Sequence, residues 1–329
     1  MPTRIETISL KQIDGEDRAF AVSPAWFPLG QLVSTVEQVG IISPLHLQRT
    51  EAGRLRIVMG FRRFRAAQAI GLTEVPGLLR EGGSQQLFRE GILENVGSRC
   101  LHALEKAWIL LRLQSQFVLD ESALIQDYLP LLGLRPDRFH LRHYLALARL
   151  PESIQRAVYD YLDGELAVKV ARWQREEYEF FLEISSGYRL GRNKQKLLFG
   201  LLDDLRMQQR LSTGSTPEIS SLQVLWQRAG LEEIAKDEQV GSPERFERIV
   251  QRLRELRYPT LSQHEGRYSL LKKGLKLPPE IQLRPPAFFE GERISVSFSC
   301  RTAEEFLSLA DRLREVGRSE ELREIFKLL

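Results

Sequence analysis

A short strand runs into a helix through a single glycine near residue 60 of this chain. Apolar side chains alternate over residues 55–59, which is typical of a strand. Over residues 61–70 they recur at helical spacing, and Gly71 ends that pattern. Gly60 occupies the junction, where the chain often needs a backbone conformation that only glycine adopts at low cost. The sequence therefore predicts a strand–glycine–helix unit, around which the neighbouring segments are arranged.

Three arginines follow the junction glycine within the first turn and a half of the predicted helix: Arg62, Arg63 and Arg65. The first amides of a helix lack internal acceptors, and the helix dipole makes that end positive. Helix amides and arginines together predict an anion site. The alternative is that the arginines only solvate one face of a surface helix. No glycine-lysine-serine/threonine follows at the required spacing, so this is not a Walker loop.

Composition limits the class of protein. The chain has 329 residues with 43% hydrophobic content, enough for two or three domains with real cores. Its 47 basic and 44 acidic residues give a net charge of +3, so any nucleic-acid contact requires a local basic patch. Cys100 and Cys300 lie far apart, which fits a reducing compartment. No membrane-length apolar run or apolar signal core is present, so we expect a cytoplasmic protein without a membrane partner.

The first hundred residues alternate between strand and helix patterns. Strands are expected at residues 4–13, 45–48 and 74–79, in addition to the strand before Gly60. Helical spacing covers residues 28–39 and 85–95. These patterns predict a small mixed α/β domain.

Four ordered segments of this domain resemble the ParB/sulfiredoxin superfamily, and the resemblance covers about residues 5 to 100. A turn separates the first segment from the strand that precedes the second. The segments are, in order, Gly40-Ile41-Ile42-Ser43-Pro44-Leu45, Gly60-Phe61-Arg62-Arg63-Phe64-Arg65-Ala66-Ala67, Gly71-Leu72-Thr73-Glu74-Val75-Pro76 and Glu94-Asn95-Val96. The chain looks like a ParB amino-terminal domain here, and several ordered motifs with matching gaps are a specific signal. No cysteine is present in the glycine-arginine box, which excludes a sulfiredoxin-type repair activity.

The resemblance implies a pocket for CTP and Mg²⁺. The glycine-arginine box would hold the triphosphate, the segment from Gly40 to Leu45 would lie against the base, and Glu94 and Asn95 would supply oxygens toward Mg²⁺. Glu94 is also the candidate catalytic residue. The nucleotide-binding residues implied in this way are Gly40, Ser43, Pro44, Gly60, Phe61, Arg62, Arg63, Arg65, Glu94 and Asn95.

Two departures from the family pattern concern hydrolysis. Phe61 stands where most relatives carry glutamate, and Arg99 comes one place later after Glu94-Asn95 than relatives usually have it. We therefore expect nucleotide binding with slow or absent CTP hydrolysis. The alternative for Glu94 and Asn95 is a helix C-terminal turn without a ligand.

The middle of the chain, residues 101–212, reads as all-α, and its first part, residues 101–160, resembles the family's helix-turn-helix region more faintly. A first helix runs to about Phe117, Ser122 is a candidate cap of the next, and Gly133 lies before a helix over residues 138–150. Three more helices are expected over residues 152–212. A purely structural helical bundle is the alternative. The residues expected to meet DNA are Arg135, Arg138, Arg142 and His143, with a second basic group at Arg189, Arg192 and Lys194.

The predicted fold class is α+β, in three parts. These are a ParB/sulfiredoxin-like nucleotide-binding domain over 1–100, a helical helix-turn-helix-like domain over 101–212, and a mostly helical α+β region of unknown role over 213–329. A linker is expected at 212–217. In the last part, helices are expected at 221–236, 243–257 and 302–316, with a strand at 293–298.

The leading functional hypothesis is a CTP-regulated DNA-binding protein of the chromosome- or plasmid-partition or transcription-regulator type, which also allows a homodimer. A second hypothesis is a small-molecule kinase of the same superfamily, resembling a free-serine kinase, with Glu16 or Asp17 as the base; an exposed acidic turn is the alternative for these two residues. A third is a nucleotide-free interaction scaffold that uses the C-terminal part. A nucleotide panel separates the third hypothesis from the others, and salt-dependent DNA binding separates the first from the second.

Overall fold

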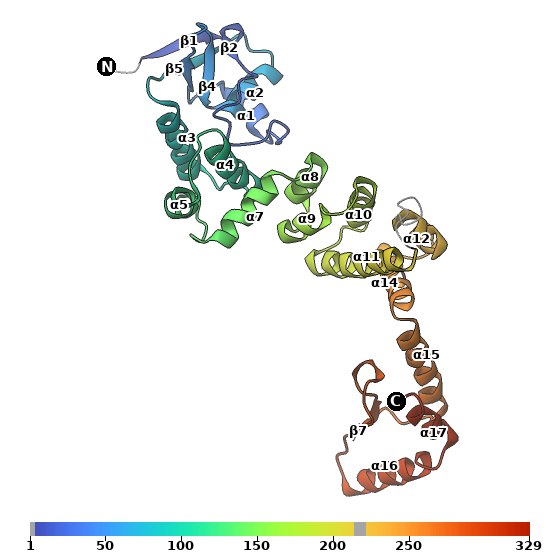
Figure 1. Cartoon of the computed structure of the whole chain (residues 1–329). Helices are drawn as coiled ribbons and strands as arrows, with labels where there is room; N and C mark the ends of the chain where they lie inside the picture. The colour runs from blue at the N-terminus through green and yellow to red at the C-terminus, as the bar shows by residue number, and fades with distance from the viewer. Residues whose placement is uncertain (1–3, 214–221) are drawn as a thin grey trace. The chain divides into compact units, whose positions relative to one another are not determined.

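The computed structural model describes residues 4–213 and 222–329, and the chain forms two compact units, Met1–Arg175 and Glu176–Leu329 (Figure 1). This division matches neither expected domain boundary, 100 or 212. The N-terminal sheet and the helices after residue 100 share one apolar core, which explains why contacts do not separate them there. The three-part division stays a prediction.

The first unit begins with a small domain of strands and helices and continues as helices (Figure 1). Its elements are β1 (Ile5–Ser9), η1 (Leu10–Gln12), β2 (Ile13–Asp14), α1 (Leu32–Val39), β3 (Leu45–Arg49), β4 (Leu55–Met59), α2 (Phe61–Ala69), β5 (Glu74–Leu79), α3 (Ser84–Ser98), α4 (Ala103–Ser115), α5 (Glu121–Ala123), η2 (Leu124–Tyr128), α6 (Leu129–Leu131), α7 (Arg138–Ala148), α8 (Glu152–Asp160) and α9 (Gly164–Val170). The predicted α+β class is confirmed, and the strand–glycine–helix unit is β4, Gly60 and α2.

The five strands form one mixed sheet in the order β1-β5-β3-β4-β2. β1 pairs antiparallel with β5 and β3 antiparallel with β4, whereas β3–β5 and β2–β4 are parallel. Because β3 lies between β4 and β5, helix α2 carries the chain across β3. This crossover holds the start of α2 at the end of β4, beside the loop that leads into β3.

Strand β4 is buried on both faces and joins two cores. Leu55 and Ile57 pack with Phe64 of α2 in the core that lies between the sheet and that helix. Val58 and Met59 instead belong to the core formed with α3, α4 and α7. A strand covered on both sides contributes apolar burial in two directions, so β4 fixes the sheet and the helical layer together.

The helices after the sheet follow the predicted pattern, with three differences in detail. Asp120, rather than Ser122, caps the segment after α4, because its carboxylate accepts the Ala123 amide at 2.7 Å. A π-helical turn, η2, lies between α5 and α6, directly before the turn that contains Pro130. Four helices, α8 to α11, rather than three, follow Pro151, because Asp163 caps a separate short helix, α9.

The second unit is mostly helical. Its elements are α10 (Arg175–Gly187), whose first residue closes the first unit, then α11 (Arg192–Thr213), α12 (Leu222–Arg228), α13 (Leu231–Lys236), α14 (Ser242–Arg257), α15 (Pro259–Gly274), β6 (Ile281–Arg284), η4 (Ala287–Phe289), β7 (Ser295–Phe298), α16 (Ala303–Val316) and α17 (Glu320–Phe326). The expected linker at 212–217 falls mainly on residues 214–221, outside the described residues. Helices α15 and α17 and strand β6 were not predicted.

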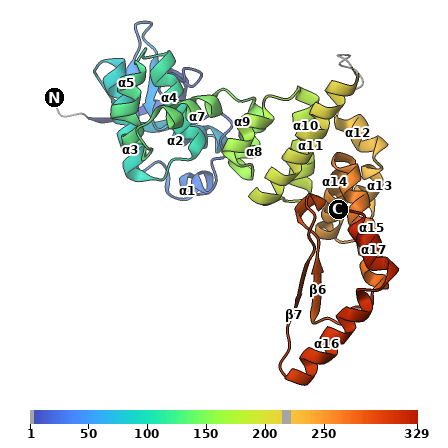
Figure 2. The same cartoon turned by 60° about the horizontal axis from the view of Figure 1, so that its bottom comes forward.

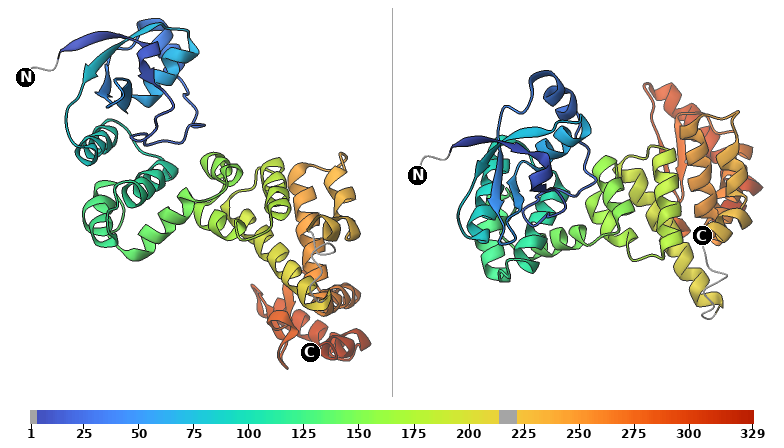
Figure 3. Two further views of the ribbon diagram at one scale, coloured as in Figure 1. Left: turned by 45° about the horizontal axis from the view of Figure 1, so that its top comes forward. Right: turned by 90° about the horizontal axis from the view of Figure 1, so that it is seen from above.

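Within the second unit, α11 and α14 pack side by side (Figure 3). β6 pairs antiparallel with β7 as a narrow two-stranded sheet, which Figure 2 shows near α16. A small core formed by Leu275, Leu283, Val316 and Ile325 joins β6 to the surrounding helices. Across residues 4–213 and 222–329, no helix has both the length and the apolar character needed to cross a membrane.

Candidate functional site

The start of α2 depends on glycine. Gly60 has φ 100° and ψ 20°, in the left-handed region, and a Cβ there would come within 2.6 Å of Leu45 Cδ2. The first internal bond of the helix runs from the Phe64 amide to the Gly60 carbonyl at 2.9 Å. Among the described residues, no side chain caps this end of α2. The amides of residues 61–63 therefore precede the internal hydrogen bonds and are available to a ligand.

A cavity of about 730 Å³ opens beside this helix end. Its walls come from the loop before α1, the start of α1, the loop before β3, the end of β4, the start of α2 and the second half of α3. Of the ten residues expected to bind nucleotide, seven lie in its lining: Ser43, Gly60, Phe61, Arg62, Arg63, Glu94 and Asn95. The other three, Gly40, Pro44 and Arg65, lie outside the lining.

Arg63 ties the helix start to the loop before β3. Its Nη1 donates to the Ser43 carbonyl and to Ser43 Oγ, both at 2.7 Å, and to the Pro44 carbonyl at 2.9 Å. Its Nη2 lies 3.4 Å from Glu94 Oε1 on α3. Burial lowers the pKa of Arg63, and Glu94 opposes that shift. Arg63 thus links the loop before β3 to α3 and holds these two walls of the cavity in place.

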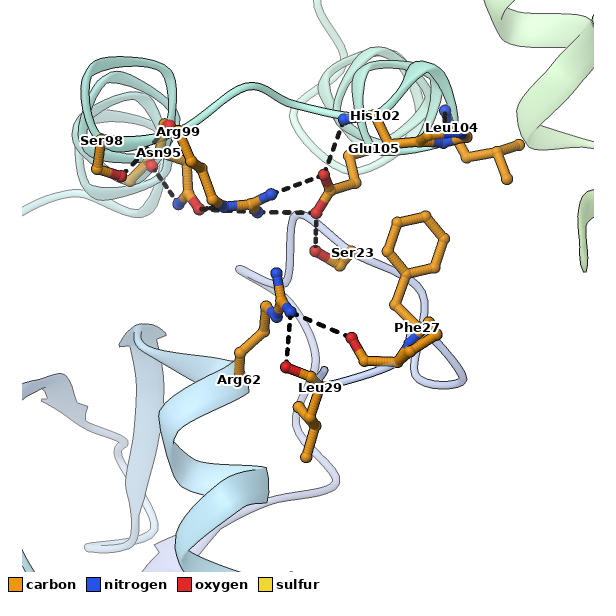
Figure 4. A network of polar contacts seen from close by, with 12 residues as sticks. Ser23, Phe27, Leu29, Arg62, Asn95, Ser98, Arg99, His102, Leu104 and Glu105 are labelled. Atoms are coloured by element: carbon orange, nitrogen blue, oxygen red, sulfur yellow. Dashed lines mark hydrogen bonds and ion pairs between the residues drawn. The ribbon is translucent and has the colours of Figure 1, made fainter. Parts of the chain in front are cut away.

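Arg62 and Arg65 hold the loop that leads to α1. Arg62 Nη2 donates to the Pro28 and Leu29 carbonyls, each at 3.1 Å (Figure 4). Arg65 Nη1 donates to the Phe27 carbonyl at 2.9 Å. Arg62 Nε is buried and has no hydrogen-bond partner among the described residues. The arginines that the sequence offered as phosphate ligands therefore also build the loop over the site.

The second half of α3 is joined to α4 by a buried carboxylate, which Figure 4 shows at the centre of its network. Glu105, 2% exposed, accepts two bonds of 2.8 Å from Arg99 and one of 3.0 Å from the His102 amide. Ser23 Oγ also donates to this carboxylate. Arg99 donates to Asn95 Oδ1 at 3.0 and 3.2 Å. One carboxylate thus connects the loop over the cavity, its α3 wall and the first helix of the helical part.

Sequence reasoning missed Ser23 and Glu105, and it treated Arg99 only as a displaced family residue. The available signal was the first turn of α4, where His102 and Glu105 form a capping box. Burial raises the pKa of Glu105, but the hydrogen bonds from Arg99 and Ser23, with the Arg99 charge, outweigh it and lower the pKa overall. The carboxylate is therefore ionised at neutral pH.

Positive charge accumulates behind the cavity. Arg18 lies over the Phe61 ring, 5.4 Å from its centroid, and donates to the Ser23 carbonyl at 3.0 Å. Burial, and then the charge of Arg65, lowers the pKa of Arg18. Burial, and then the charge of Arg18, lowers the pKa of Arg112 to about 10. These guanidiniums stay charged at neutral pH, and their mutual repulsion would be relieved by an anion in the cavity.

The residues expected at a metal differ in availability. The Glu94 side chain is 41% exposed, so one carboxylate is accessible at the cavity wall. Both amide atoms of Asn95 are engaged, because Nδ2 donates to the Gly91 carbonyl at 2.8 Å and Oδ1 accepts from Arg99. The described residues contain no cluster of three His, Cys, Asp or Glu side chains suited to a metal. A metal here would need ligand oxygens from a phosphate.

The acidic turn offered as the base of a kinase lies outside the cavity lining. Asp14 Oδ1 accepts the amides of Glu16 and Asp17, each at 3.2 Å, and Asp17 Oδ1 accepts the Ala19 amide at 3.0 Å. The turn is thus stabilised by its own backbone. The carboxylates of Glu16 and Asp17 are therefore not placed to act on a ligand in this cavity.

The candidate DNA-facing helix is α7, which follows the turn at Gly133. Asp137 caps this helix by accepting the His140 amide at 2.8 Å. This cap was not predicted from the sequence. Arg135, Arg138 and Arg142 are exposed in or before this helix. His143 is half-buried near Gly164 at the start of α9, with its pKa lowered by burial. The arginines are presented to solvent, whereas His143 contributes to packing.

The second basic group lies apart from α7 in the chain, in the second unit. Arg189, Arg192 and Lys194 line a cavity of about 530 Å³ together with the first residues of α14. They do not form a flat surface patch.

The sequence of the first unit is similar to that of known proteins. Residues 3–96 match the ParB N-terminal domain family. A probable chromosome-partitioning protein ParB of Neisseria meningitidis is 28% identical over 156 residues, which are 47% of this chain and 52% of that protein. The chain thus spans about half the length of this curated relative.

Two solved structures are also similar. One is C-terminally truncated ParB from Caulobacter crescentus with CTP-γ-S, which shows 25% identity, a TM-score of 0.26 and coverage of 52% of this chain and 93% of that one. The other is the same truncated protein with the centromeric parS site, which shows 22% identity, a TM-score of 0.33 and coverage of 59% and 97%. On the sequence match, residues 3–96 form a ParB N-terminal domain, and the chain is similar to chromosome-partitioning ParB proteins.

Proposed function

We propose that this ParB-like chain is a DNA-binding protein regulated by a nucleoside triphosphate, CTP, and acts in chromosome or plasmid partition or in transcriptional regulation. The observation that carries the proposal is the cavity at the glycine-started end of α2, inside the domain that matches the ParB family. The names of its relatives support partition, and CTP-γ-S and parS DNA are the ligands of its structural neighbours. A homodimer stays a prediction.

The cavity fits a nucleotide. Its volume of about 730 Å³ is in the range of small-ligand sites, which is roughly 300–1,000 Å³. The helix amides after Gly60 would donate hydrogen bonds to phosphate oxygens, and the fixed backbone of Gly60 would not need to reorganise. Ser43, held by Arg63, would place its loop toward the other end of the ligand. Bound CTP would also offset the positive charge behind the site.

Mg²⁺ fits this site through Glu94 rather than through Asn95. Mg²⁺ is commonly held by one or two carboxylates together with substrate phosphates and water. Glu94 supplies one accessible carboxylate, while Asn95 would first have to release Arg99. We therefore assign Glu94 to the metal and Asn95 to the positioning of Arg99. When bound, Mg²⁺ would neutralise phosphate charge. Slow or absent hydrolysis remains the expectation, because Phe61 packs as an apolar side chain beneath Arg18.

DNA binding is assigned to the exposed basic face of α7. Arg138 and Arg142 lie four residues apart and therefore share one face of the helix. α7 packs against α4, and α4 carries Glu105 of the cavity network. This continuous packing gives the nucleotide site a physical connection to the DNA-facing helix.

A thermal-shift panel on the full chain tests the nucleotide assignment. Nucleoside di- and triphosphates would be added with and without Mg²⁺, and we expect CTP to give the largest rise in melting temperature. A ligand at 100 times its dissociation constant stabilises the fold by about 2.7 kcal/mol. Arg63→Ala should abolish that shift. Arg89→Ala changes an exposed arginine of α3 outside the cavity and should keep it.

The panel also separates the alternatives. An unchanged shift in Arg63→Ala would show that the pocket is wrongly assigned. No shift with any nucleotide would favour the scaffold. A shift without DNA affinity at low salt would favour the kinase.

A further inference from the structure

The second unit contains a cavity of its own, of about 530 Å³, between the turn that joins α10 to α11 and the start of α14. The turn is fixed from within: the Arg189 amide donates to the Ser186 carbonyl and the Leu190 amide to the Ser185 carbonyl, both at 3.0 Å. Leu190 is buried beneath it. These contacts hold the wall of the cavity in place before any ligand arrives.

Arg189 has an unusual backbone. Its φ is 48°, in the left-handed region that non-glycine residues rarely adopt. Such residues persist only where the surrounding structure enforces them, and they cluster at binding sites. Glycines stand on both sides at Gly187 and Gly191, yet the unusual backbone falls on the arginine. The turn therefore places a guanidinium in the cavity lining at the expense of backbone strain.

The lining is basic. Arg189, Arg192 and Lys194 contribute three cations. Lys194 Nζ lies 3.0 Å from Glu247, but both side chains are well exposed, at 45% and 66%. Exposed ion pairs of this kind are weak, so Lys194 can leave Glu247 and bind an anion that offers a stronger interaction.

Two further features suit an oxyanion. Ser242 and Pro243 begin α14, a 16-residue helix, on the opposite wall, and no side chain of the described residues caps that helix end. The floor is aromatic, because Tyr188 and Phe246 lie 5.7 Å apart and Lys194 Nζ lies 5.2 Å from the Phe246 centroid. The apolar floor lowers the local polarisability around the cations and strengthens their attraction for an anion.

We propose that this cavity binds a phosphate group. Arginine forks, a lysine and the Ser242 amide at the start of α14 match the several acceptor oxygens of a phosphate better than a two-oxygen carboxylate. The phosphate would belong either to a nucleic-acid strand or to a free phosphorylated small molecule. The cavity lies wholly in the second unit, so the proposal does not rest on CTP binding in the first.

Site-resolved lysine labelling of the full chain tests the proposal. An amine-reactive ester would be applied with inorganic phosphate, with CMP or with duplex DNA, and peptides would be quantified by mass spectrometry. We expect phosphate to slow labelling of Lys194 relative to Lys196. Lys196 is a matched internal control, because it is exposed on the same helix but lies outside the cavity lining. Chloride at equal ionic strength corrects for screening.

Variants add an affinity measurement. Arg189→Asn removes the cation while keeping a residue that tolerates the left-handed backbone, and Lys194→Gln removes the second cation. Each should weaken inorganic phosphate binding in calorimetry by about tenfold or more, as expected for a charge-assisted hydrogen bond. Lys196→Gln should change it less than about twofold. Melting curves confirm that the variants fold.

Labelling in the presence of CMP and of duplex DNA distinguishes the source of the phosphate. Protection of Lys194 by CMP but not by duplex DNA assigns a free phosphorylated molecule. Protection by DNA, with a salt slope reduced by about one unit in Lys194→Gln, assigns a nucleic-acid strand. If no probe slows Lys194 more than Lys196, the proposal is wrong. Because the readout is on Lys194 itself, none of these outcomes depends on whether CTP binds near Gly60.

Discussion

Two basic turns of this chain begin a helix after a glycine, and they use their cations differently. At α2, Arg62 and Arg63 donate to backbone carbonyls of the surrounding loops. At α11, Arg192 and Lys194 line an open cavity, and the partner of Lys194 is an exposed carboxylate. In the first turn the guanidinium groups hold the surrounding loops in place, and the helix amides remain available to a ligand. The second keeps its side chains at the cavity surface.

The difference shows why counting arginines does not identify an anion site. Three arginines near α2 suggested phosphate ligands, but Arg65 lies outside the cavity lining and donates to the loop before α1. What remains for a ligand there is a backbone feature, fixed by Gly60. Substitutions at matched positions of the two regions should therefore have unequal effects.

The largest expected difference is between two carboxylates. Glu105 is buried and bonded to Arg99, so Glu105→Gln should lower the free energy of unfolding by about 3–5 kcal/mol, toward the lower end because Arg99 is partly exposed. Glu247→Gln should cost at most about 1 kcal/mol, since its pair with Lys194 is exposed. Urea unfolding of both variants measures the contrast, and equal losses would contradict it.

The same carboxylate predicts a pH dependence. The folded-state pKa of Glu105 is lowered, so its contribution to stability is present above the unfolded-state pKa, about 4.3. It is lost as the pH falls through the lower folded-state value. Glu105→Gln should therefore flatten the fall in stability below about pH 4.3. A profile as steep as that of the wild type would show that other carboxylates dominate acid unfolding.

The next contrast is between the two glycines. Gly60→Ala combines a left-handed φ with a 2.6 Å approach to Leu45 Cδ2, and strain plus overpacking should cost about 3 kcal/mol. A Cβ at Gly191 meets nothing within 4 Å among the described residues, and its φ is not in the left-handed region. Gly191→Ala should therefore change stability by less than about 0.5 kcal/mol. Thermal melts of both variants check this ordering.

How far the sequence predicts the structure differs between the same regions. Around Gly60, a local glycine requirement, strand alternation and helical spacing all agree, so β4, α2 and β5 were predicted almost to the residue. The cavity network was not, because Ser23 and Glu105 meet across 82 positions of sequence. No local pattern reports such a contact.

The C-terminal part was harder for a different reason. Helix α15 has no buried residue and a weak apolar period, so its 16 residues gave no pattern from which a helix could be predicted. Strand β6 is only four residues long, and α17 is a seven-residue helix that Ser319 caps. Their shared core of single residues from several elements forms only after folding. Sequence periodicity therefore fails where each element contributes one or two apolar contacts.

The stabilisation by CTP should also differ between variants of the two basic regions, at α2 and at α11. Arg63→Ala should remove the stabilisation by CTP, about 2.7 kcal/mol at 100 times the dissociation constant. Arg63 holds Ser43 and Pro44, so its loss should release the loop at one end of the nucleotide. Lys194→Gln lies in the other unit and should leave the CTP shift unchanged. A loss of the shift in both variants would mean that nucleotide affinity is not local to the cavity near Gly60.

The smallest expected effect concerns DNA and α7. The Arg138 side chain is 74% exposed, and its Nε lies 3.9 Å from Glu121 Oε1. Such an exposed and distant ion pair is weak, so Arg138→Ala should barely change stability. The same holds for exposed Arg142. If these side chains meet phosphates, each substitution should weaken binding to all sequences and reduce the salt slope by about one unit. Gel-shift titrations at two salt concentrations measure this, with Arg89→Ala as the control on α3.

A base contact would behave differently, costing about 1–3 kcal/mol at one position of a specific site and little elsewhere. We expect the phosphate outcome, because Asp137 caps α7 in place of a hydroxyl residue and Arg138 and Arg142 are exposed to solvent. This contrasts with Lys194, whose cavity should select a single phosphate. If Arg138→Ala and Arg142→Ala leave the slope unchanged while Lys194→Gln reduces it, DNA is held by the second unit, and the assignment of α7 is wrong.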